Sequence, residues 1–354
     1  MEIDMIEIDG SYGEGGGQIL RSSIALSVLT KKPITVNNIR ANRPKPGIKP
    51  QHHAVLSILK TLSNAEASGL EVGSSKIEFF PKNINGGKFR FDVGTAGSIV
   101  LIYQALLFAS LKIKKPISIE LTGGTDVKWA PSWDYFVNVF MPFLKKIDID
   151  ATVVLQKRGY YPKGGGNATI HMQPVETVTP VQLDQLEIQD KISGKIHFNA
   201  LPDHVAKRMK QTVYKKCFEK SIRVDISQKQ SETSSPGIVM TLWVDDKEIY
   251  IGCVGLGEKG IAAEHIGNQC SMNLIKMMET GATIDTFLFD QILGFLACAK
   301  GTSTFFIPEL SDHAKTNMWL IQQFFPGKNI FNTCFNKKNT KVIIHGQDIY
   351  SFKE

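Results

Sequence analysis

Cysteine is scarce in this sequence and is not arranged for metal binding. The five cysteines, at positions 217, 253, 270, 298 and 334, form no Cys-x-x-Cys pair and have no histidine at the spacing of a zinc site. The pattern therefore excludes a zinc finger and a small secreted scaffold held by disulfides. We expect reduced, mostly buried thiols and a cytoplasmic protein.

Long uninterrupted apolar runs are also missing. The first ten residues are acidic and carry no apolar signal core. The most apolar helical runs, 98–111 and 285–299, are interrupted by Gln104 and by the pair Asp290 and Gln291, so neither predicts a membrane span. With 42% hydrophobic and 21% charged residues over 354 positions, the chain is expected to fold into a large globular body with no membrane partner.

Neither of the common nucleotide-binding glycine motifs is present. The stretch GEGGGQILR at 13–21 lacks the Gly-Lys-Ser/Thr of a Walker A loop and the spaced glycines of the dinucleotide fingerprint. Its glycines precede a predicted helix on which Glu14, Gln18 and Arg21 are spaced to share one face. Two interpretations stay open, a plain turn and an anion site at the positive end of a helix.

Positive charge is present in excess. The chain has 41 Lys and Arg against 34 Asp and Glu, a net charge of +7, which is consistent with a nucleic acid partner. In RANRPKPGIKPQHH at 40–53, cations alternate with prolines and could follow a phosphate backbone, although a solvated basic loop is an equal alternative. In RGYYPKGGG at 158–166, cations flank two tyrosines, either to bind and stack a nucleotide or as a packed hairpin.

An internal repeat organises the chain. A helix, a Lys-Pro pair and a β-branched strand occur at 15–44 and again at 94–126, and each copy continues as an amphipathic helix and a strand–turn–strand. A third copy lies at 287–352, and residues 184–280 break the pattern. This predicts an α/β fold: a body of three repeats, residues 1–183 and 281–354, with a smaller inserted α/β domain at 184–280.

One histidine stands out as a candidate nucleophile. In SDHAKTN, Ser311 or Asp312 is expected to cap a helix and to leave His313 in its first turn. The positive end of the helix dipole there favours a neutral, nucleophilic imidazole. A surface histidine is the alternative.

Taken together, these stretches resemble the RNA 3′-terminal phosphate cyclase family over essentially the entire chain. The matching signatures, in order, are GEGGGQILR, RANRPKPG with PQH, GTAGS with YQ, GGTD with AP and DY, RGYYPKGGG, LPDHVA, DQ at 290–291 and HAKTN. The resemblance implies that each repeat is a four-stranded sheet with two helices. It also implies a ligase-class enzyme that uses ATP to convert an RNA 3′-phosphate into a 2′,3′-cyclic phosphate through a covalent histidyl-AMP and an RNA(3′)pp(5′)A intermediate.

The same resemblance implies roles for individual residues. His313 is the expected nucleophile, and Glu14 is the expected ligand of a divalent metal, Mg²⁺ or Mn²⁺. The adenosine of ATP and its phosphates are expected at Gln104, Phe287, Leu288, Phe289, Asp290 and Gln291, and Gln18 is also expected to bind ATP. Arg21, Arg40, Arg43 and Gln51 are expected to bind the triphosphate or the RNA 3′-phosphate end. The chain departs from the usual family pattern at Phe289 and at Lys128.

Two alternative functions remain at this point. A non-catalytic relative of the family serves ribosome biogenesis and lacks the nucleophilic histidine, which His313, Gln104 and the basic signatures argue against here. Enolpyruvyl transferases share a similar repeated unit, but they use more repeats and no adenylated histidine.

Overall fold

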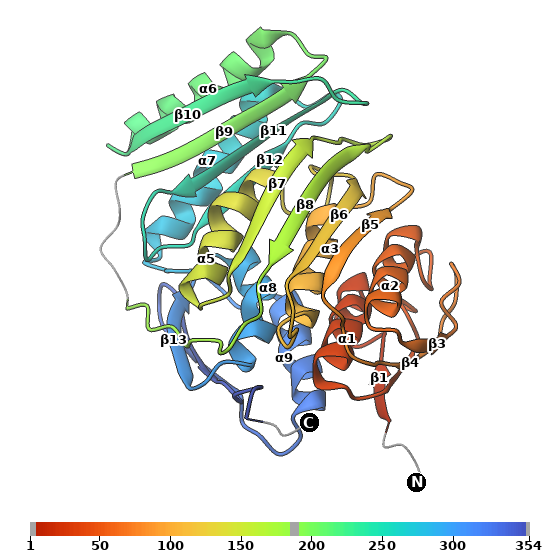
Figure 1. Ribbon diagram of the computed structural model, residues 1–354. Helices are drawn as coiled ribbons and strands as arrows, with labels where there is room; N and C mark the ends of the chain where they lie inside the picture. The colour runs from red at the N-terminus through yellow and green to blue at the C-terminus, as the bar shows by residue number, and fades with distance from the viewer. Residues whose placement is uncertain (1–4, 185–190, 352–354) are drawn as a thin grey trace.

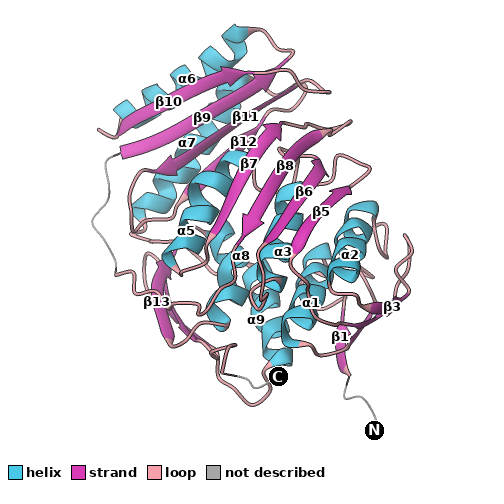
Figure 2. Ribbon diagram, in the orientation of Figure 1, coloured by secondary structure: helices cyan, strands magenta, loops and turns pink. Residues whose placement is uncertain are grey.

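The structure, a computed structural model, describes residues 5–184 and 191–351 (Figures 1 and 2). The first unit is a four-stranded sheet with two helices. Its elements are β1 (Ile6–Asp9), α1 (Gly17–Thr30), β2 (Ile34–Asn37), α2 (Pro50–Leu62), β3 (Glu66–Ser68) and β4 (Ile77–Phe80). The strand order is β1-β2-β4-β3, and β1 runs parallel to β2 because α1 crosses between them.

The second unit repeats this topology. Its elements are β5 (Gly87–Asp92), α3 (Ile99–Ala109), β6 (Ile117–Gly123), α4 (Trp133–Tyr135), η1 (Phe136–Phe140), α5 (Met141–Lys146), β7 (Ala151–Lys157) and β8 (Gly166–Met172). The order β5-β6-β8-β7 matches the first sheet strand for strand, with the first pair parallel around α3. Here the second helix is assembled from α4, a π-helical turn η1 and α5. The repeat that the sequence predicts is therefore confirmed.

The third unit departs from four strands. It contains α8 (Thr286–Ala297), β13 (Thr302–Ile307), α9 (Asp312–Phe324), β14 (Phe331–Phe335) and β15 (Thr340–His345), and its sheet has the order β13-β15-β14. Residues 181–183 occupy the place of the missing strand, parallel to β13. They pair with Thr304 through two backbone hydrogen bonds of 2.9 and 2.8 Å, which is too short a ladder to count as a strand.

The chain between the second and third units has its own sheet and core. Its elements are β9 (Lys191–Asn199), α6 (Asp203–Phe218), β10 (Arg223–Gln230), β11 (Gly237–Val244), β12 (Gly252–Leu256) and α7 (Ala263–Glu279). The strand order is β10-β9-β11-β12, and α6 packs against α7 over one face. A hydrophobic cluster between Ile192 and Ala282 is separate from the main core. The predicted start of this insert adjoins residues 185–190, which lie outside the described residues, so its boundaries stay a prediction.

Four helices meet at the centre of the body. Helix α1 packs against α3 and α9, and α8 packs against α3 and α9 (Figure 1). Close approach is possible because Gly294 of α8 has no side chain: a Cβ there would lie 2.8 Å from the ring of Phe108 on α3. Within the described ranges, none of the helices has the length and apolar character needed to span a membrane. The packing brings the first turns of α1, α8 and α9 to one cavity.

Candidate active site

His313 lies in the first turn of α9, where both of its ring nitrogens contact residues from the loop and helix of the first unit. Nε2 is 3.0 Å from Oε2 of Glu14, and Nδ1 is hydrogen-bonded to Oε1 of Gln18. Ser311 is the N-cap of α9, and its Oγ accepts a hydrogen bond from the Ala314 N–H at 2.9 Å. The predicted cap is thus Ser311 rather than Asp312. Both ring nitrogens thus face acceptor oxygens. When Nδ1 donates to Gln18, the lone pair of the neutral ring is on Nε2, and the Glu14 carboxylate must turn away from Nε2 before that lone pair can attack.

The glycine-rich loop before α1 is shaped by close packing. Gly13 and Gly15 have φ values of 55° and 54°, a left-handed conformation that favours glycine. A Cβ on Gly17 would lie 1.9 Å from Nε2 of His52. No side chain caps the start of α1. The glycines therefore satisfy a tight turn and close packing, and they leave the positive end of α1 without a side-chain acceptor.

Asp290 connects α8 to α9. Its Oδ1 accepts a hydrogen bond from Ser311 Oγ at 2.6 Å, and its carbonyl oxygen accepts one from Asn317 Nδ2 at 2.8 Å. Burial raises the pKa of Asp290 to about 7; the hydrogen bond from Ser311 opposes this, and the carboxylates of Asp285 and Glu14 add to it. Asp290 is therefore partly protonated near neutral pH.

Two glutamines connect α3 to α8. Gln104 Nε2 donates to Oε1 of Gln291, and Gln291 Nε2 donates to the carbonyl oxygen of Phe287 at 2.6 Å. Phe287 is 59% exposed, whereas Leu288 and Phe289 are fully buried in the core. Helical spacing explains the difference, because positions 287, 290 and 291 share one face of α8 and positions 288 and 289 lie on another. Of the five residues expected at ATP here, Leu288 and Phe289 thus have no side-chain access to a ligand.

The arginines of the set have different surroundings. In the described part of the chain, Arg21 makes no hydrogen bond or ion pair, and burial lowers its pKa to about 10. Arg43 Nη2 lies 3.5 Å from Glu14 Oε2. Arg40 Nη1 instead donates to the carbonyl oxygens of Lys45 and Gly47 at 2.8 and 3.0 Å, so part of its guanidinium braces its own loop. Arg21 is the cation most available to an anion.

A cavity of about 790 Å³ lies among these helices and the insert. Seven residues of the expected set line it: Gln18, Arg21, Gln104, Phe287, Asp290, Gln291 and His313. Glu14, Arg40, Arg43 and Gln51 are outside its lining, although Glu14 contacts His313. The structure therefore gathers a histidine, an arginine that has no partner among the described residues and several amides around one space that could hold a nucleotide.

The family profile described as RNA 3′-terminal phosphate cyclase matches residues 12–329. The chain belongs to the RNA 3′-terminal phosphate cyclase family. It is 42% identical to the RNA 3′-terminal phosphate cyclase of Pyrococcus furiosus, over 91% of this chain and 93% of that protein. It is 39% identical to the cyclase of Methanopyrus kandleri, over 92% and 94% of the two chains.

A solved structure shows a weaker likeness. The enolpyruvyl transferase NikO from Streptomyces tendae matches with 9% sequence identity and a TM-score of 0.41, over 98% of this chain and 49% of that chain.

Some cavity residues of this cyclase family member are not among those predicted from the sequence. Ser311 and Asn317 flank His313, and the spacing of Asn317 four residues after His313 could have placed it on the same helical face. The wall contributed by the insert, including Gln269 and Asn273 of α7, has no such local signal. Its position depends on contacts between segments more than a hundred residues apart in the sequence.

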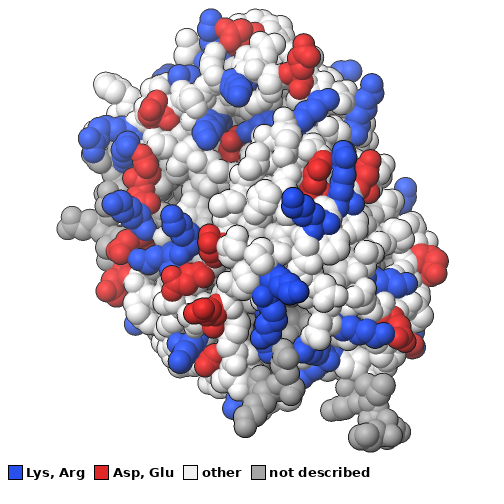
Figure 3. Space-filling view, in the orientation of Figure 1, with Lys and Arg blue, Asp and Glu red and all other residues white. Residues whose placement is uncertain are grey.

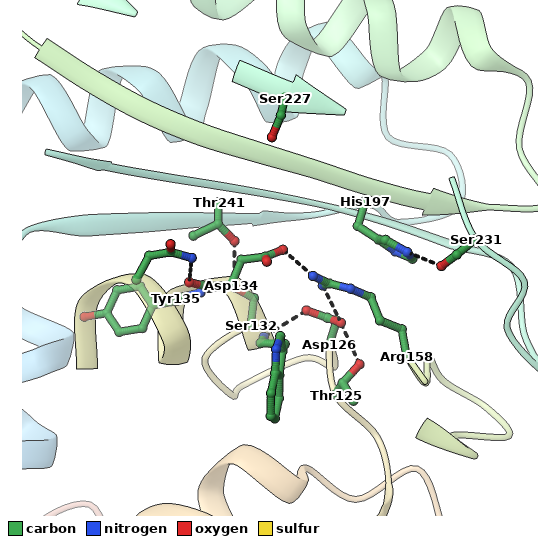
Figure 4. Close-up of polar contacts among 12 residues, drawn as sticks. Thr125, Asp126, Ser132, Asp134, Tyr135, Arg158, His197, Ser227, Ser231 and Thr241 are labelled. Carbon is green, nitrogen blue, oxygen red and sulfur yellow. Dashed lines mark hydrogen bonds and ion pairs between the residues drawn. The ribbon is translucent and has the colours of Figure 1, made fainter. Parts of the chain in front are cut away.

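The RGYYPKGGG signature of the cyclase family has a structural role in this chain. The buried Arg158 guanidinium pairs with Asp126 at 3.0 Å and with Asp134 at 2.6 Å (Figure 4). The buried Tyr160 hydroxyl is 2.6 Å from Nδ1 of His197 on β9. Arg158 is therefore committed to an ion-pair cluster within the second unit, and Tyr160 to the contact between the second unit and the insert, whereas the Tyr161 side chain is exposed. Of the two interpretations of this stretch, the packed hairpin is therefore the one that fits Arg158 and Tyr160.

Proposed function

We propose that this protein uses ATP to convert an RNA 3′-terminal phosphate into a 2′,3′-cyclic phosphate. The observation that carries the proposal is the placement of His313, whose Nδ1 contacts Gln18 at a cavity that also contains Arg21, Gln104 and Gln291. Membership of the family and the names of its relatives agree with this activity. On the face seen in Figure 3, Lys and Arg alternate with Asp and Glu, so the proposal does not depend on one continuous basic surface there.

The chain's own groups suit a transfer through histidine. Attack by Nε2 on the α-phosphorus of ATP forms a P–N bond and breaks the bond to pyrophosphate. The proton stays on Nδ1, which donates it in a hydrogen bond to Oε1 of Gln18. An oxygen of the RNA 3′-phosphate then attacks the same phosphorus, and neutral His313 departs with the P–N electron pair. The product is RNA(3′)pp(5′)A.

The last step is intramolecular. The 2′-OH attacks the RNA phosphorus and releases AMP, and the hydroxyl proton passes to the departing phosphate or to water. Effective molarities of about 10⁵ to 10⁸ M for such reactions make positioning sufficient for much of the rate. Arg21 lines the cavity and has no partner in the described residues, which supports a role in binding phosphate oxygens.

Glu14 fits a divalent metal as a single carboxylate donor. No cluster of three or more His, Cys, Asp and Glu side chains forms a metal cage among residues 5–184 and 191–351, but Mg²⁺ is commonly held by one or two carboxylates together with substrate phosphates. A metal bound there would screen the triphosphate charge. Glu14, which would hold this metal, also contacts His313 and Arg43.

Labelling tests the proposal directly. ATP labelled at the α-phosphate should give a covalent AMP adduct on His313 and release pyrophosphate without RNA. The adduct should be labile in mild acid and stable in base, and it should pass to RNA that ends in a 3′-phosphate. His313→Asn should abolish it, and Glu14→Ala should weaken it. An adduct on lysine, or cyclisation at the normal rate by His313→Asn, would contradict the mechanism.

A further inference from the structure

Trp129 lies at the cavity with almost all of its surface exposed. Its side chain is 93% exposed, yet it lines the space that also contains His313. Its φ of 60° is left-handed, a conformation that a bulky residue rarely adopts. Such backbone conformations occur where the surrounding structure enforces them, often at ligand-binding sites.

The loop that carries Trp129 is anchored on both sides. Before it, the buried Asp126 carboxylate pairs with Arg158 and accepts a hydrogen bond from the Trp133 N–H at 3.0 Å. After it, Ser132 Oγ is hydrogen-bonded to Thr241 Oγ1 of β11 at 2.7 Å. The exposed indole is therefore held on a braced loop and not on a free one.

Charged and polar groups line the same cavity on the side of the insert. Lys128 Nζ lies 5.9 Å from the centre of the Trp129 ring and 2.6 Å from Glu258 Oε2 in the insert. On α7, three exposed cavity residues follow each other at helical intervals of four: His265, Gln269 and Asn273. Their side chains make no hydrogen bond within the described residues, so their polar groups are available to a ligand.

The reaction proposed above needs two nucleotides in the cavity at once, because AMP stays on His313 while the RNA end attacks it. The residues expected at adenosine, Gln104, Phe287 and Gln291, belong to α3 and α8. Trp129 and the polar residues of α7 line the same cavity, and none of them is among the residues expected to bind adenosine.

We propose that Trp129 stacks on the 3′-terminal nucleobase of the RNA substrate, with the polar residues of α7 facing the same nucleotide. This inference rests on the proposed function and adds the binding site for the second substrate. Stacking on an indole tolerates every base, because every base presents a π-face. The site therefore selects an unpaired terminal nucleotide without selecting its sequence.

Trp129→Ala, Trp129→Phe and a matched control test the stack. The control is Phe218→Ala, which removes another exposed aromatic side chain, 85% exposed at the end of α6 and outside the cavity lining. Trp129→Ala should raise KM for a 3′-phosphate oligoribonucleotide about tenfold, the order expected for loss of one base stack, with kcat changed less than about threefold. Trp129→Phe should retain most of the affinity, and Phe218→Ala should match the parent protein.

An RNA whose terminal nucleotide lacks its base but keeps the 2′-OH and 3′-phosphate provides the complementary change. The parent protein should lose about as much affinity for this RNA as Trp129→Ala loses for normal RNA, and the two losses should not add. Fully additive losses, or an unchanged KM in Trp129→Ala, would overturn the proposal. A raised KM for ATP in RNA-free adenylylation would also overturn it, because the indole would then serve adenine.

The two proposals fail separately. If the parent protein forms no histidyl adduct, the proposed function fails, and fluorescence anisotropy of labelled 3′-phosphate RNA still measures the stack. Weaker binding of this RNA by Trp129→Ala but not by Phe218→Ala supports the proposed stacking. Equal binding by the parent protein, Trp129→Ala and Phe218→Ala overturns it.

Discussion

The ring of Tyr12 stacks on the indole of Trp319, with centroids 3.8 Å apart and planes 12° from parallel. Tyr12 belongs to the loop that carries Glu14, and Trp319 belongs to the helix that carries His313. Gly13 allows this loop to approach the helix closely, because a Cβ at this position would lie 2.3 Å from Thr316 Oγ1 on the same helix. The contact of 3.0 Å between Glu14 and His313 is thus held beside a second, apolar contact between the same two elements.

This stack should affect both catalysis and stability. Tyr12→Ala should cost about 0.5–1.5 kcal/mol of unfolding free energy, the usual worth of an aromatic pair, but reduce RNA-free adenylylation about tenfold by loosening the loop. Tyr12→Phe keeps the ring and should keep the rate. Single-turnover labelling and urea unfolding measure the two effects. An unchanged rate in Tyr12→Ala would show that the loop is positioned by other contacts.

Local patterns explain which parts of the structure could be predicted. The repeat is visible because helix periodicity and turn residues are local signals, and the Ser311 cap lies within three residues of the N–H it accepts from. Helical spacing would also have separated Phe287 from Leu288 and Phe289. The partners of Arg158 and the pairing of Lys128 with Glu258 could not be predicted, because they join residues that are distant in sequence.

The Arg158 cluster should be important for stability. Arg158→Ala leaves the buried carboxylates of Asp126 and Asp134 without their cation, so it should reduce the unfolding free energy by about 3–5 kcal/mol. As a control, Lys82→Ala removes an exposed partner of Glu66 and should change stability little, because solvent screens that pair. Urea unfolding measures both. A small loss in Arg158→Ala would mean that water or the protonation of an aspartate compensates for the missing guanidinium.

Asp290 should make stability depend on pH. Its pKa is about 7 in the folded protein, above the ordinary aspartate value of about 4 that it has when unfolded. Between these values the folded state binds more protons, so this residue's contribution to stability falls as the pH rises from 4 to 7. Asp290→Asn keeps an oxygen for Ser311 but removes the charge. The advantage of the variant over the parent should therefore grow with pH, by about 1–3 kcal/mol between pH 5 and pH 8.

Urea unfolding at several pH values without nucleotide checks this dependence. Asp225→Asn, which removes an exposed carboxylate from β10, is the control for loss of a charge at the protein surface. A constant difference between Asp290→Asn and the parent protein would show that Asp290 is ionised throughout the range.

Arg21 should separate stability from activity. Burial lowers its pKa to about 10, and it has no partner in the described ranges, so the folded protein holds a cation that nothing neutralises. Arg21→Met keeps much of the length of the side chain and should raise the unfolding free energy by about 0.5–2 kcal/mol.

Because the triphosphate lacks its cation in Arg21→Met, adenylylation by this variant should fall by about two orders of magnitude or more. ATP should stabilise the parent protein against heat but not this variant. If Arg21→Met is less stable than the parent without ATP, Arg21 is a structural residue of the fold, and a normal rate of adenylylation in the variant would remove Arg21 from the phosphate site.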